Sequence, residues 1–457
     1  MGKYFGTDGF RGEAGVTLTA DHAYKVGRFL GWYYGMLRQR NGETTAPRIV
    51  IGKDTRRSSY MFEYSLVAGL TASGADAYLL HVTTTPSVAY IARVDDFDCG
   101  IMISASHNPY YDNGIKLIDC YGEKMDEETL LLVEDYLDGK LHIFDQDWPE
   151  LPFASRDHVG CTVDYVAGRN RYMGYLISLG IYSFRGVKVG LDCANGSSWN
   201  IAKSVFDALG ADTYVINNKP NGLNINLNAG STHIEGLQKF VVENHLDIGF
   251  AYDGDADRCL AVDERGRVVD GDQILYVCGV YLNKHGRLSG GTVVPTIASN
   301  FGLIKSLELA GLSAVTSGVG DRHVYAKMRE GGYSLGGEQT GHTIFGDIER
   351  TGDGIMTSLR VMEVIRAERE TLSQLTAPCR LLPQAQVAVR VADKDAALDS
   401  MGVQNAIAEA ETSLAGEGRV LVRKSGTESV IRVLAEAPDQ AAANAAMKRI
   451  ASALEAL

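Results

Sequence analysis

The sequence predicts an α/β protein with three related α/β domains that contain mixed sheets, followed by a smaller C-terminal α+β domain. Strand-like apolar runs alternate with helical stretches through most of the chain, which is typical of sheets with parallel pairing and helices on their faces. The last segment changes to alanine-rich helical stretches around short strands. A length of 457 residues, at about 100–200 residues per domain, agrees with three or four domains.

One strand–helix–strand unit recurs three times. Each copy begins with an apolar strand, continues through a polar loop and a helix, and returns to a strand after a glycine-containing turn. The copies start at Arg48, Val187 and Gly291, and their return strands start at Ala77, Thr213 and Ser313. Because the spacing is unequal and too long for a solenoid, we interpret the copies as separate domains.

The domain boundaries are expected where the composition changes. The stretch from Asp145 to Pro152 is acidic and contains prolines, which marks the end of the first domain. A second boundary is expected near Asp253 to Arg258, and the character of the chain changes again after Pro378. We therefore predict domains at residues 1–154, 155–256, 257–372 and 373–457.

The composition excludes several classes of protein. A formal net charge of -13 argues against a broad basic face for nucleic acid or anionic membranes. No apolar run is long enough to span a bilayer, and the N-terminal residues lack the apolar core of a signal peptide. The seven cysteines are odd in number and lack metal-ligand spacing, so we expect reduced thiols and a cytoplasmic protein.

A loop with two serines follows the apolar run from Gly100 to Ile103. Ser104 and Ser106 precede a histidine, and Asn-Pro and Asp-Asn-Gly turns lead on to Lys116. A hydroxyl on a turn held by a stiff scaffold suits a nucleophile or a covalent carrier. A polar turn that bonds only its own backbone is the competing interpretation, and this stretch alone favours it.

Three carboxylates alternate along the segment from Asp253 to Arg258. Asp253, Asp255 and Asp257 are hard oxygen ligands, and their mutual repulsion favours a bound cation such as Mg²⁺ or Ca²⁺. An EF-hand is excluded because its sixth place holds Arg258 rather than glycine. A hydrolase loop with Asp253 as the nucleophile and a solvated acidic turn are the alternatives.

Two glycine-rich segments come near nucleotide-binding motifs without matching them. The segment Gly318 to Arg322 is followed by His323 where a dinucleotide fingerprint needs glycine, and a later segment has His342 where a P-loop needs lysine. We reject both nucleotide interpretations. Glu338, Thr340 and His342 instead suit polyol recognition or proton transfer.

Two further loops combine cations with flexible backbone. Arg11 lies among glycines near the N-terminus, an arrangement that suits a phosphate as well as a plain tight turn. Residues 423–428 bring together cations, hydroxyls and a glycine, and Arg423 is able to bind a phosphate monoester with two hydrogen bonds. A solvated polar hairpin is the alternative for this second loop.

In this order, the loops resemble those of the α-D-phosphohexomutase superfamily over essentially the whole chain. The Ser-Ala-Ser-His-Asn-Pro loop resembles the phosphoserine loop of that family, and the Asp-Gly-Asp-Ala-Asp-Arg loop resembles its Mg²⁺ loop. The segments 4–12, 103–116 and 423–428 are most similar to the phosphoglucosamine mutase branch. The sequence departs from that pattern at Thr340 (usually serine), Ala256 (commonly glycine) and Ser429 (typically proline).

The resemblance implies a four-domain isomerase with one Mg²⁺ per active site and a phosphate carried on Ser106. The implied catalytic residues are Ser106, Lys116, His342 and Arg11, and the implied metal ligands are Ser106, Asp253, Asp255 and Asp257. The implied substrate-binding residues are Arg258, Asp321, Arg322, Glu338, Thr340, Arg423, Ser425, Gly426, Thr427 and Arg432. The reaction implied is the interconversion of two amino-sugar phosphates through a bisphosphate, with movement of the last domain.

Three other functions stay open from the sequence. Phosphomannomutase or phosphoglucomutase activity is left open by Thr340, a Mg²⁺-dependent phosphatase would use Asp253, and a phosphosugar sensor would bind without turnover. The expected partner is a small sugar phosphate, with no nucleic acid and no membrane. A homodimer also stays open.

Overall fold

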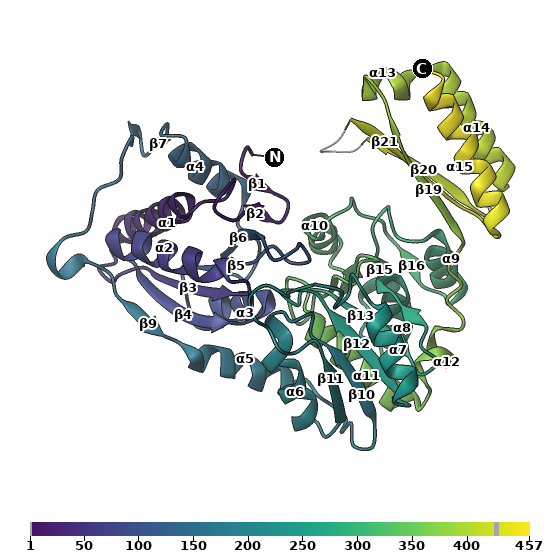
Figure 1. Ribbon diagram of the computed structural model, residues 1–457, viewed down its shortest axis with the longest axis horizontal. Helices are drawn as coiled ribbons and strands as arrows, with labels where there is room; N and C mark the ends of the chain where they lie inside the picture. Colours follow the sequence, from purple (N-terminus) through teal and green to yellow (C-terminus); the bar gives the residue numbers. More distant parts are fainter. Residues whose placement is uncertain (1, 425–428) are drawn as a thin grey trace.

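The computed structural model describes residues 2–424 and 429–457 of the chain (Figure 1). Within these residues, three α/β domains precede a smaller C-terminal domain with an antiparallel sheet, which confirms the predicted fold class. The C-terminal domain, drawn in yellow, stands at the far end of the molecule from the first sheet and attaches beside the third domain. The described residues contain no helix that is long and apolar enough to cross a membrane.

The first sheet mixes parallel and antiparallel pairs. Its strands, in spatial order, are β1 (Phe5–Gly6), β2 (Gly9–Glu13), β6 (Asp112–Asp119), β5 (Cys99–Ile103), β3 (Arg48–Lys53), β4 (Asp76–Val82) and β9 (Thr162–Asp164). Its helices are α1 (Ala20–Arg40), α2 (Ser58–Ala72), α3 (Thr85–Val94) and α4 (Glu127–Leu137), and a small hairpin pairs β7 (His142–Ile143) with β8 (Gln146–Asp147). Helices α1 and α2 cross closely at Gly69. A Cβ atom there would lie only 2.2 Å from the carbonyl oxygen of Tyr24, so the crossing requires glycine.

The second and third sheets repeat this plan on a smaller scale. The second has the order β11 (Asp212–Ile216), β10 (Lys188–Asp192), β12 (Ile248–Tyr252), β13 (Cys259–Asp263) and β14 (Val268–Val269), with helices α5 (Val166–Ser178), α6 (Ala202–Ala208) and α7 (Glu235–Glu243). The third has the order β16 (Ser313–Ala314), β15 (Thr292–Val294), β17 (Leu335–Gly337) and β18 (Thr343–Phe345). Its helices are α8 (Gly271–Lys284), α9 (Phe301–Leu309), α10 (Asp321–Gly331), α11 (Gly354–Glu368) and α12 (Leu372–Thr376).

The last sheet is antiparallel throughout its described strands. Its order is β19 (Gln384–Arg390), β21 (Val430–Glu436) and β20 (Arg419–Lys424), covered by α13 (Lys394–Asp399), α14 (Met401–Leu414) and α15 (Gln440–Glu455). The second sheet includes β13 and β14, so it continues past residue 256, where the sequence analysis ends the second domain. The acidic loop 253–258 therefore connects two antiparallel neighbours of one sheet.

The hydrophobic cores show which domains are joined firmly. One continuous cluster of buried side chains runs through the second and third domains, from Tyr172 to Cys379. The C-terminal domain has its own cluster, and polar contacts attach it to the third domain. Glu436 accepts the Phe301 N–H at 3.0 Å, and Asn300 accepts the Leu382 N–H at 2.9 Å. A separate core and a polar attachment are typical of a domain that moves as a unit.

Two buried contacts tie the first three domains together. Arg93 of α3 reaches both carboxylate oxygens of Glu349 at 3.0 Å. Tyr172 of α5 donates its hydroxyl to Asp353, the residue that caps α11, at 2.6 Å. Helices α3 and α5 thus hold one segment of the third domain, which contains Glu349 and Asp353. The first three domains therefore form one common frame.

A buried arginine organises the loop that follows β5. The Arg56 guanidinium is 0% exposed and pairs with Asp54, with 2.7 Å between Nε and Oδ2. It also donates to the main-chain carbonyls of Ser106 and Asn108, both at 2.9 Å, and of Asp112 at 3.0 Å. Ser106 has a φ of 52°, which a serine rarely adopts, so the loop needs this external support.

We expect Arg56→Met to lower the free energy of unfolding by about 3–5 kcal/mol, because it leaves the Asp54 carboxylate buried without its partner. Urea denaturation followed by circular dichroism measures this change. The neighbouring Arg57 is exposed, so Arg57→Met serves as the matched control and should unfold like the parent protein. Equal midpoints for the two variants would contradict the role of Arg56.

Candidate active site

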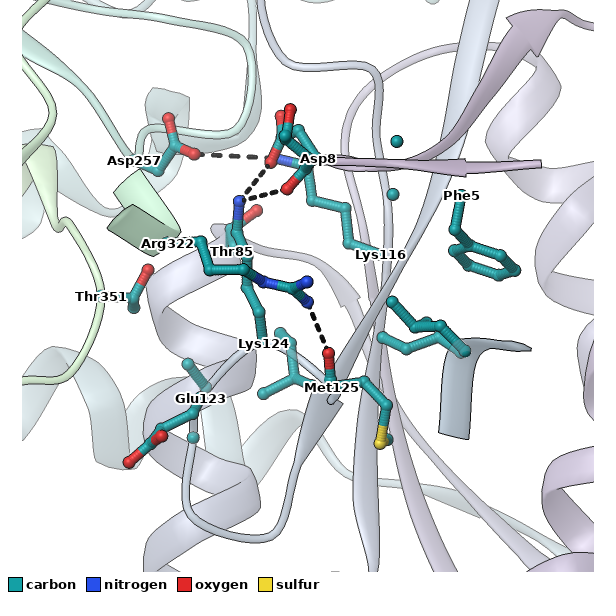
Figure 2. Close-up of a pocket in the computed structure, with 18 residues that line it drawn as sticks. Phe5, Asp8, Thr85, Lys116, Glu123, Lys124, Met125, Asp257, Arg322 and Thr351 are labelled. Atoms are coloured by element: carbon teal, nitrogen blue, oxygen red, sulfur yellow. Dashed lines mark hydrogen bonds and ion pairs between the residues drawn. The ribbon is translucent and has the colours of Figure 1, made fainter. Parts of the chain in front are cut away.

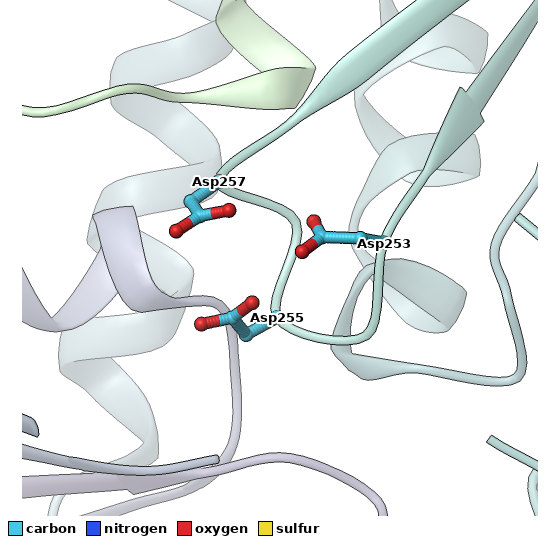
Figure 3. A group of neighbouring side chains, drawn as sticks. All are labelled: Asp253, Asp255 and Asp257. Carbon is cyan, nitrogen blue, oxygen red and sulfur yellow. The ribbon is translucent and has the colours of Figure 1, made fainter. Parts of the chain in front are cut away.

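The three aspartates of the acidic loop form a compact cluster. Asp253, Asp255 and Asp257 are buried, and one ligand oxygen from each lies within 4.8 Å of the others (Figure 3). The loop turns between β12 and β13, whose pairing brings Tyr252 opposite Cys259. Ala256 adopts a φ of 59° at the turn, a conformation in which glycine is less strained.

The charges of this cluster require compensation. Burial raises the pKa of Asp253 well above its usual range, and the neighbouring carboxylates of Asp257 and Asp255 raise it further. Burial also raises the pKa of Asp257, but Lys116 and His342 outweigh it and lower that pKa. One oxygen each of Asp255 and Asp257 is buried without a hydrogen-bond partner. Orphaned carboxylate oxygens that converge in this way fit a divalent cation with hard oxygen ligands.

Only one of the two loop serines faces this cluster. The Ser106 hydroxyl donates to Asp253 Oδ2 at 2.6 Å. The Ser104 hydroxyl donates to Asp54 at 2.7 Å and accepts the Ser106 N–H at 2.9 Å. Ser104 thus supports the backbone of its neighbour, and Ser106 offers its oxygen to the carboxylates. The sequence could not separate these two roles.

Lys116 returns to the cluster from β6. The β5–β6 pairing sets Lys116 opposite Met102, beside the serine loop. Its ammonium lies 2.7 Å from Asp255 Oδ2, 3.2 Å from Asp8 Oδ2 and 3.6 Å from Asp257 Oδ2. Burial lowers the pKa of Lys116, but these carboxylates outweigh it and raise that pKa, so the ammonium is charged.

His342 lies on the opposite side of the cluster, just before β18. Its Nε2 accepts the Gly352 N–H at 3.0 Å, and its Nδ1 lies 3.7 Å from Asp257 Oδ2. Burial lowers the pKa of His342, but the nearby carboxylates outweigh burial and raise this pKa to about 9. The hydrogen bond from the Gly352 N–H, in contrast, requires a lone pair on Nε2. A cation beside Asp257 would offset the charge that raises the pKa. We therefore assign the neutral ring with its proton on Nδ1.

Two guanidinium groups flank the serine loop. Arg11 of β2 forms an ion pair with Asp8 and lies 3.4 Å from the side-chain oxygen of Asn108. Arg258 donates its main-chain N–H to Asp253 Oδ1 at 3.3 Å, and its guanidinium lies 3.3 Å from His107 Nδ1. Burial, Arg258 and Arg11 together lower the pKa of His107 to about 4. Two guanidinium groups therefore lie beside the serine loop, next to the carboxylates, and such groups are suited to binding a phosphate.

The other third-domain residues predicted to bind the substrate differ in whether they already have partners within the protein. Asp321 is paired with Lys124 at 2.7 Å, and Arg322 donates to the Met125 carbonyl at 2.6 Å, so both are held against the first domain. Glu338 accepts the Gly320 N–H at 2.9 Å and is half-buried. Thr340 is exposed at the rim.

The C-terminal domain presents its predicted cations separately from the aspartates. Arg423 and Arg432 are direct partners across the β20–β21 pair. They line a cavity of about 520 Å³ together with Ala298 and Gln339 of the third domain. Like charges at opposing positions destabilise a sheet, and an anion bound between them removes that cost. The predicted contacts Ser425, Gly426 and Thr427 lie outside the described residues.

Sequence analysis missed two charged residues of the site. Figure 2 shows Asp8 between Lys116 and Lys124, with 3.0 Å from Asp8 Oδ1 to the Lys124 ammonium. Burial raises the pKa of Asp8, but Lys116 and Lys124 outweigh it and lower that pKa well below its usual range. The Gly-Thr-Asp-Gly turn was a local signal for Asp8, because it holds a charged residue among glycines. No local pattern marked Lys124.

The chain matches known protein families along four consecutive domains. The phosphoglucomutase/phosphomannomutase models match in order: alpha/beta/alpha domain I at residues 2–141, domain II at 171–266, domain III at 270–380 and the C-terminal domain at 387–453. Among solved structures, a phosphoglucomutase/phosphomannomutase family protein from Burkholderia thailandensis has a TM-score of 0.79 at 22% identity, covering 100% of this chain and 98% of that one. N-acetylphosphoglucosamine mutase from Aspergillus fumigatus, in complex with GlcNAc-6P and magnesium, has a TM-score of 0.69 at 20% identity, covering 99% and 95%. These two likenesses show the fold.

Closer relatives share much more of the sequence. The phosphoglucosamine mutase of Lachnospira eligens is 62% identical over 437 residues, which cover 96% of this chain and 95% of the relative. That of Lachnoclostridium phytofermentans is 59% identical over 96% of this chain and 94% of the relative. That of Geobacillus thermodenitrificans is 45% identical over 99% and 98%. Similarity of this extent, together with the serine and aspartate loops in one cluster, shows that the chain belongs to the phosphoglucosamine mutase family of the α-D-phosphohexomutases.

Proposed function

We propose that the chain interconverts glucosamine 6-phosphate and glucosamine 1-phosphate through a phosphorylated Ser106 and a bisphosphorylated sugar. The observation that carries this proposal is the Ser106 hydroxyl at 2.6 Å from Asp253, inside a cluster of orphaned carboxylate oxygens. The Ser106 hydroxyl also lies 3.3 Å from His107 Nδ1, a nitrogen that the Arg258 guanidinium contacts as well, whereas His342 contacts Asp257 rather than Ser106. Family membership supports the same reaction class.

Asp253, Asp255, Asp257 and the phosphate on Ser106 would hold one Mg²⁺. When bound, this cation would neutralise the negative charge that develops on the transferred phosphoryl group. Arg258 and Arg11 border the same loop, and their guanidinium groups would bind the remaining phosphoryl oxygens. A small sugar phosphate is thereby the expected substrate.

The proton transfers require one group on each side of the phosphoryl group. In the forward step, the phosphorus–oxygen bond to Ser106 breaks while a sugar hydroxyl attacks, and the hydroxyl proton passes to a nearby base. His342, whose Nε2 lies 3.6 Å from Asp321, and Lys116, next to Asp255, are the groups we assign to this exchange. The bisphosphate then reorients and returns its other phosphoryl group to Ser106.

The C-terminal domain would hold the phosphate that does not react. Arg423 and Arg432 line the cavity between the third and fourth domains, and residues 425–427 belong to the same predicted loop. Glu338, Thr340, Asp321 and Arg322 would border the sugar. Because the fourth domain has a core of its own, formed by side chains between Ala385 and Leu454, we propose that it moves when the ligand enters and leaves.

We expect Ser106→Ala to reduce mutase turnover to below about one thousandth, because the phosphoryl carrier is lost. Coupled assays measure turnover, and phosphopeptide mass spectrometry of the active parent enzyme should find phosphate on Ser106. If Ser106→Ala keeps phosphate-releasing activity that Asp253→Asn abolishes, the chain is instead a phosphatase that uses Asp253.

The sugar preference is tested with glucosamine, glucose and mannose 6-phosphates. We expect kcat/KM for glucosamine 6-phosphate to exceed the other two by about tenfold or more, a difference that a single well-placed polar contact supplies. A preference for glucose or mannose 6-phosphate would reassign the chain to phosphoglucomutase or phosphomannomutase activity. Tight binding without any turnover would indicate a sensor.

Binding of the non-reacting phosphate by Arg423 and Arg432 predicts that replacing either residue changes KM. Arg432→Gln and Arg423→Gln each remove a charge-assisted hydrogen bond, so KM should rise by about 10- to 100-fold. The matched control is Arg390→Gln, which changes an exposed arginine of β19 in the same sheet that does not line the cavity. Steady-state kinetics should show an unchanged KM for the control. Unchanged KM for all three variants would refute this binding.

A further inference from the structure

Lys124 connects two domains beside the cluster without touching the aspartates of the acidic loop. Its ammonium donates to the Thr7 carbonyl at 3.1 Å, to Asp8 Oδ1 at 3.0 Å and to Asp321 Oδ1 at 2.8 Å. An ammonium has three N–H donors, so each donor has an acceptor. Thr7 and Asp8 belong to the β1–β2 turn of the first domain, whereas Asp321 begins α10 of the third.

These contacts close a ring in which acidic and basic side chains alternate. In order, its members are Lys116, Asp8, Lys124, Asp321, His342 and Asp257, and the last returns to the first. Successive side-chain nitrogen and oxygen atoms lie 3.2, 3.0, 2.7, 3.6, 3.7 and 3.6 Å apart. Lys116 and His342, the groups assigned to proton transfer, are therefore joined through Asp257 on one side of the ring and through Asp8, Lys124 and Asp321 on the other. Figure 2 shows the Lys116–Asp8–Lys124 part of the ring.

The two carboxylates beside Lys124 each have a second basic neighbour. Asp8 lies 3.2 Å from the Lys116 ammonium, and Asp321 lies 3.6 Å from His342 Nε2. Without the Lys124 charge, Asp8 would compete more strongly with Asp255 for Lys116. Asp321 would likewise repel the lone pair of His342 Nε2 more strongly and shift the ring from the Gly352 N–H. Both catalytic groups would leave their present positions by a fraction of an ångström or more.

We propose that Lys124 is a positioning residue that fixes Lys116 and His342 for proton transfer by neutralising Asp8 and Asp321. The inference rests on the proposed mutase function and adds a residue that does not itself touch the reacting atoms. Burial lowers the pKa of Lys124, but Asp321 and Asp8 outweigh it and raise that pKa, so the ammonium is charged.

The contact between the two domains does not depend on Lys124. Glu123 receives Arg350 at 3.0 Å and Arg329 at 3.3 Å, and Arg322 donates to the Met125 carbonyl at 2.6 Å. These contacts join the same loop to α10 and to the segment between β18 and α11, and they lie outside the ring. Removing Lys124 should therefore leave the two domains in contact while the ring loses its bridge.

The test compares variants of the full-length enzyme by steady-state kinetics with glucosamine 6-phosphate. For Lys124→Met we expect kcat to fall by about 10- to 100-fold, since displacement of a catalytic group by about 1 Å has an effect of that size. KM should stay within about threefold because substrate contacts remain. Lys124→Arg should recover most of kcat, since a guanidinium also bridges two carboxylates.

Arg329→Met is the matched control, because it removes an ion pair between the same two domains and leaves the ring intact. Its kcat should equal that of the parent enzyme. The inference is overturned if Lys124→Met keeps its kcat, or if Arg329→Met loses as much. If Lys124→Met is insoluble, Lys124→Gln, which keeps a polar N–H₂ group but lacks the charge, decides by the same criteria. An inactive parent enzyme would instead refute the proposed function.

Discussion

The repulsion among three buried carboxylates is the constraint on which the rest of the site depends. Asp253, Asp255 and Asp257 lie on one short turn, and all three side chains are buried. Carboxylates held this close are stable only when positive charge surrounds them. Lys116 supplies that charge from the first domain and Arg258 from the turn itself, and the orphaned oxygens leave room for a cation.

The four domains differ in how firmly they are attached to one another around this carboxylate cluster. The second and third domains share one core, and the Arg93–Glu349 and Tyr172–Asp353 contacts join the first domain and α5 to that frame. Proton transfer needs positions fixed to a fraction of an ångström, which such a frame provides. The fourth domain has a separate core and a polar attachment, which would allow it to move. Such a domain can bind the distant phosphate and still let the ligand enter and leave.

Much of the fold and of the site follows from the sequence because local patterns encode them. The apolar runs became strands at Arg48–Lys53 and Cys99–Ile103, and the alternating carboxylates became a buried cluster that fits a divalent cation. Patterns of this kind depend on neighbours in the chain, so a single sequence reveals them. Strand β19 (Gln384–Arg390) is likewise an edge strand of the last sheet, since its alternation of side chains fits one covered face.

By itself, the sequence determined the order of the four domains, the loops that carry chemistry and their residue types. Only the tertiary structure decided which loop serine faces the carboxylates, because Ser104 and Ser106 differ in their contacts with Asp54 and Asp253 and hardly in their local sequence. It also decided the partners of Asp8 and Lys124, which are separated by 116 residues. Contacts of such long range arise from packing of whole domains, and no local periodicity records them.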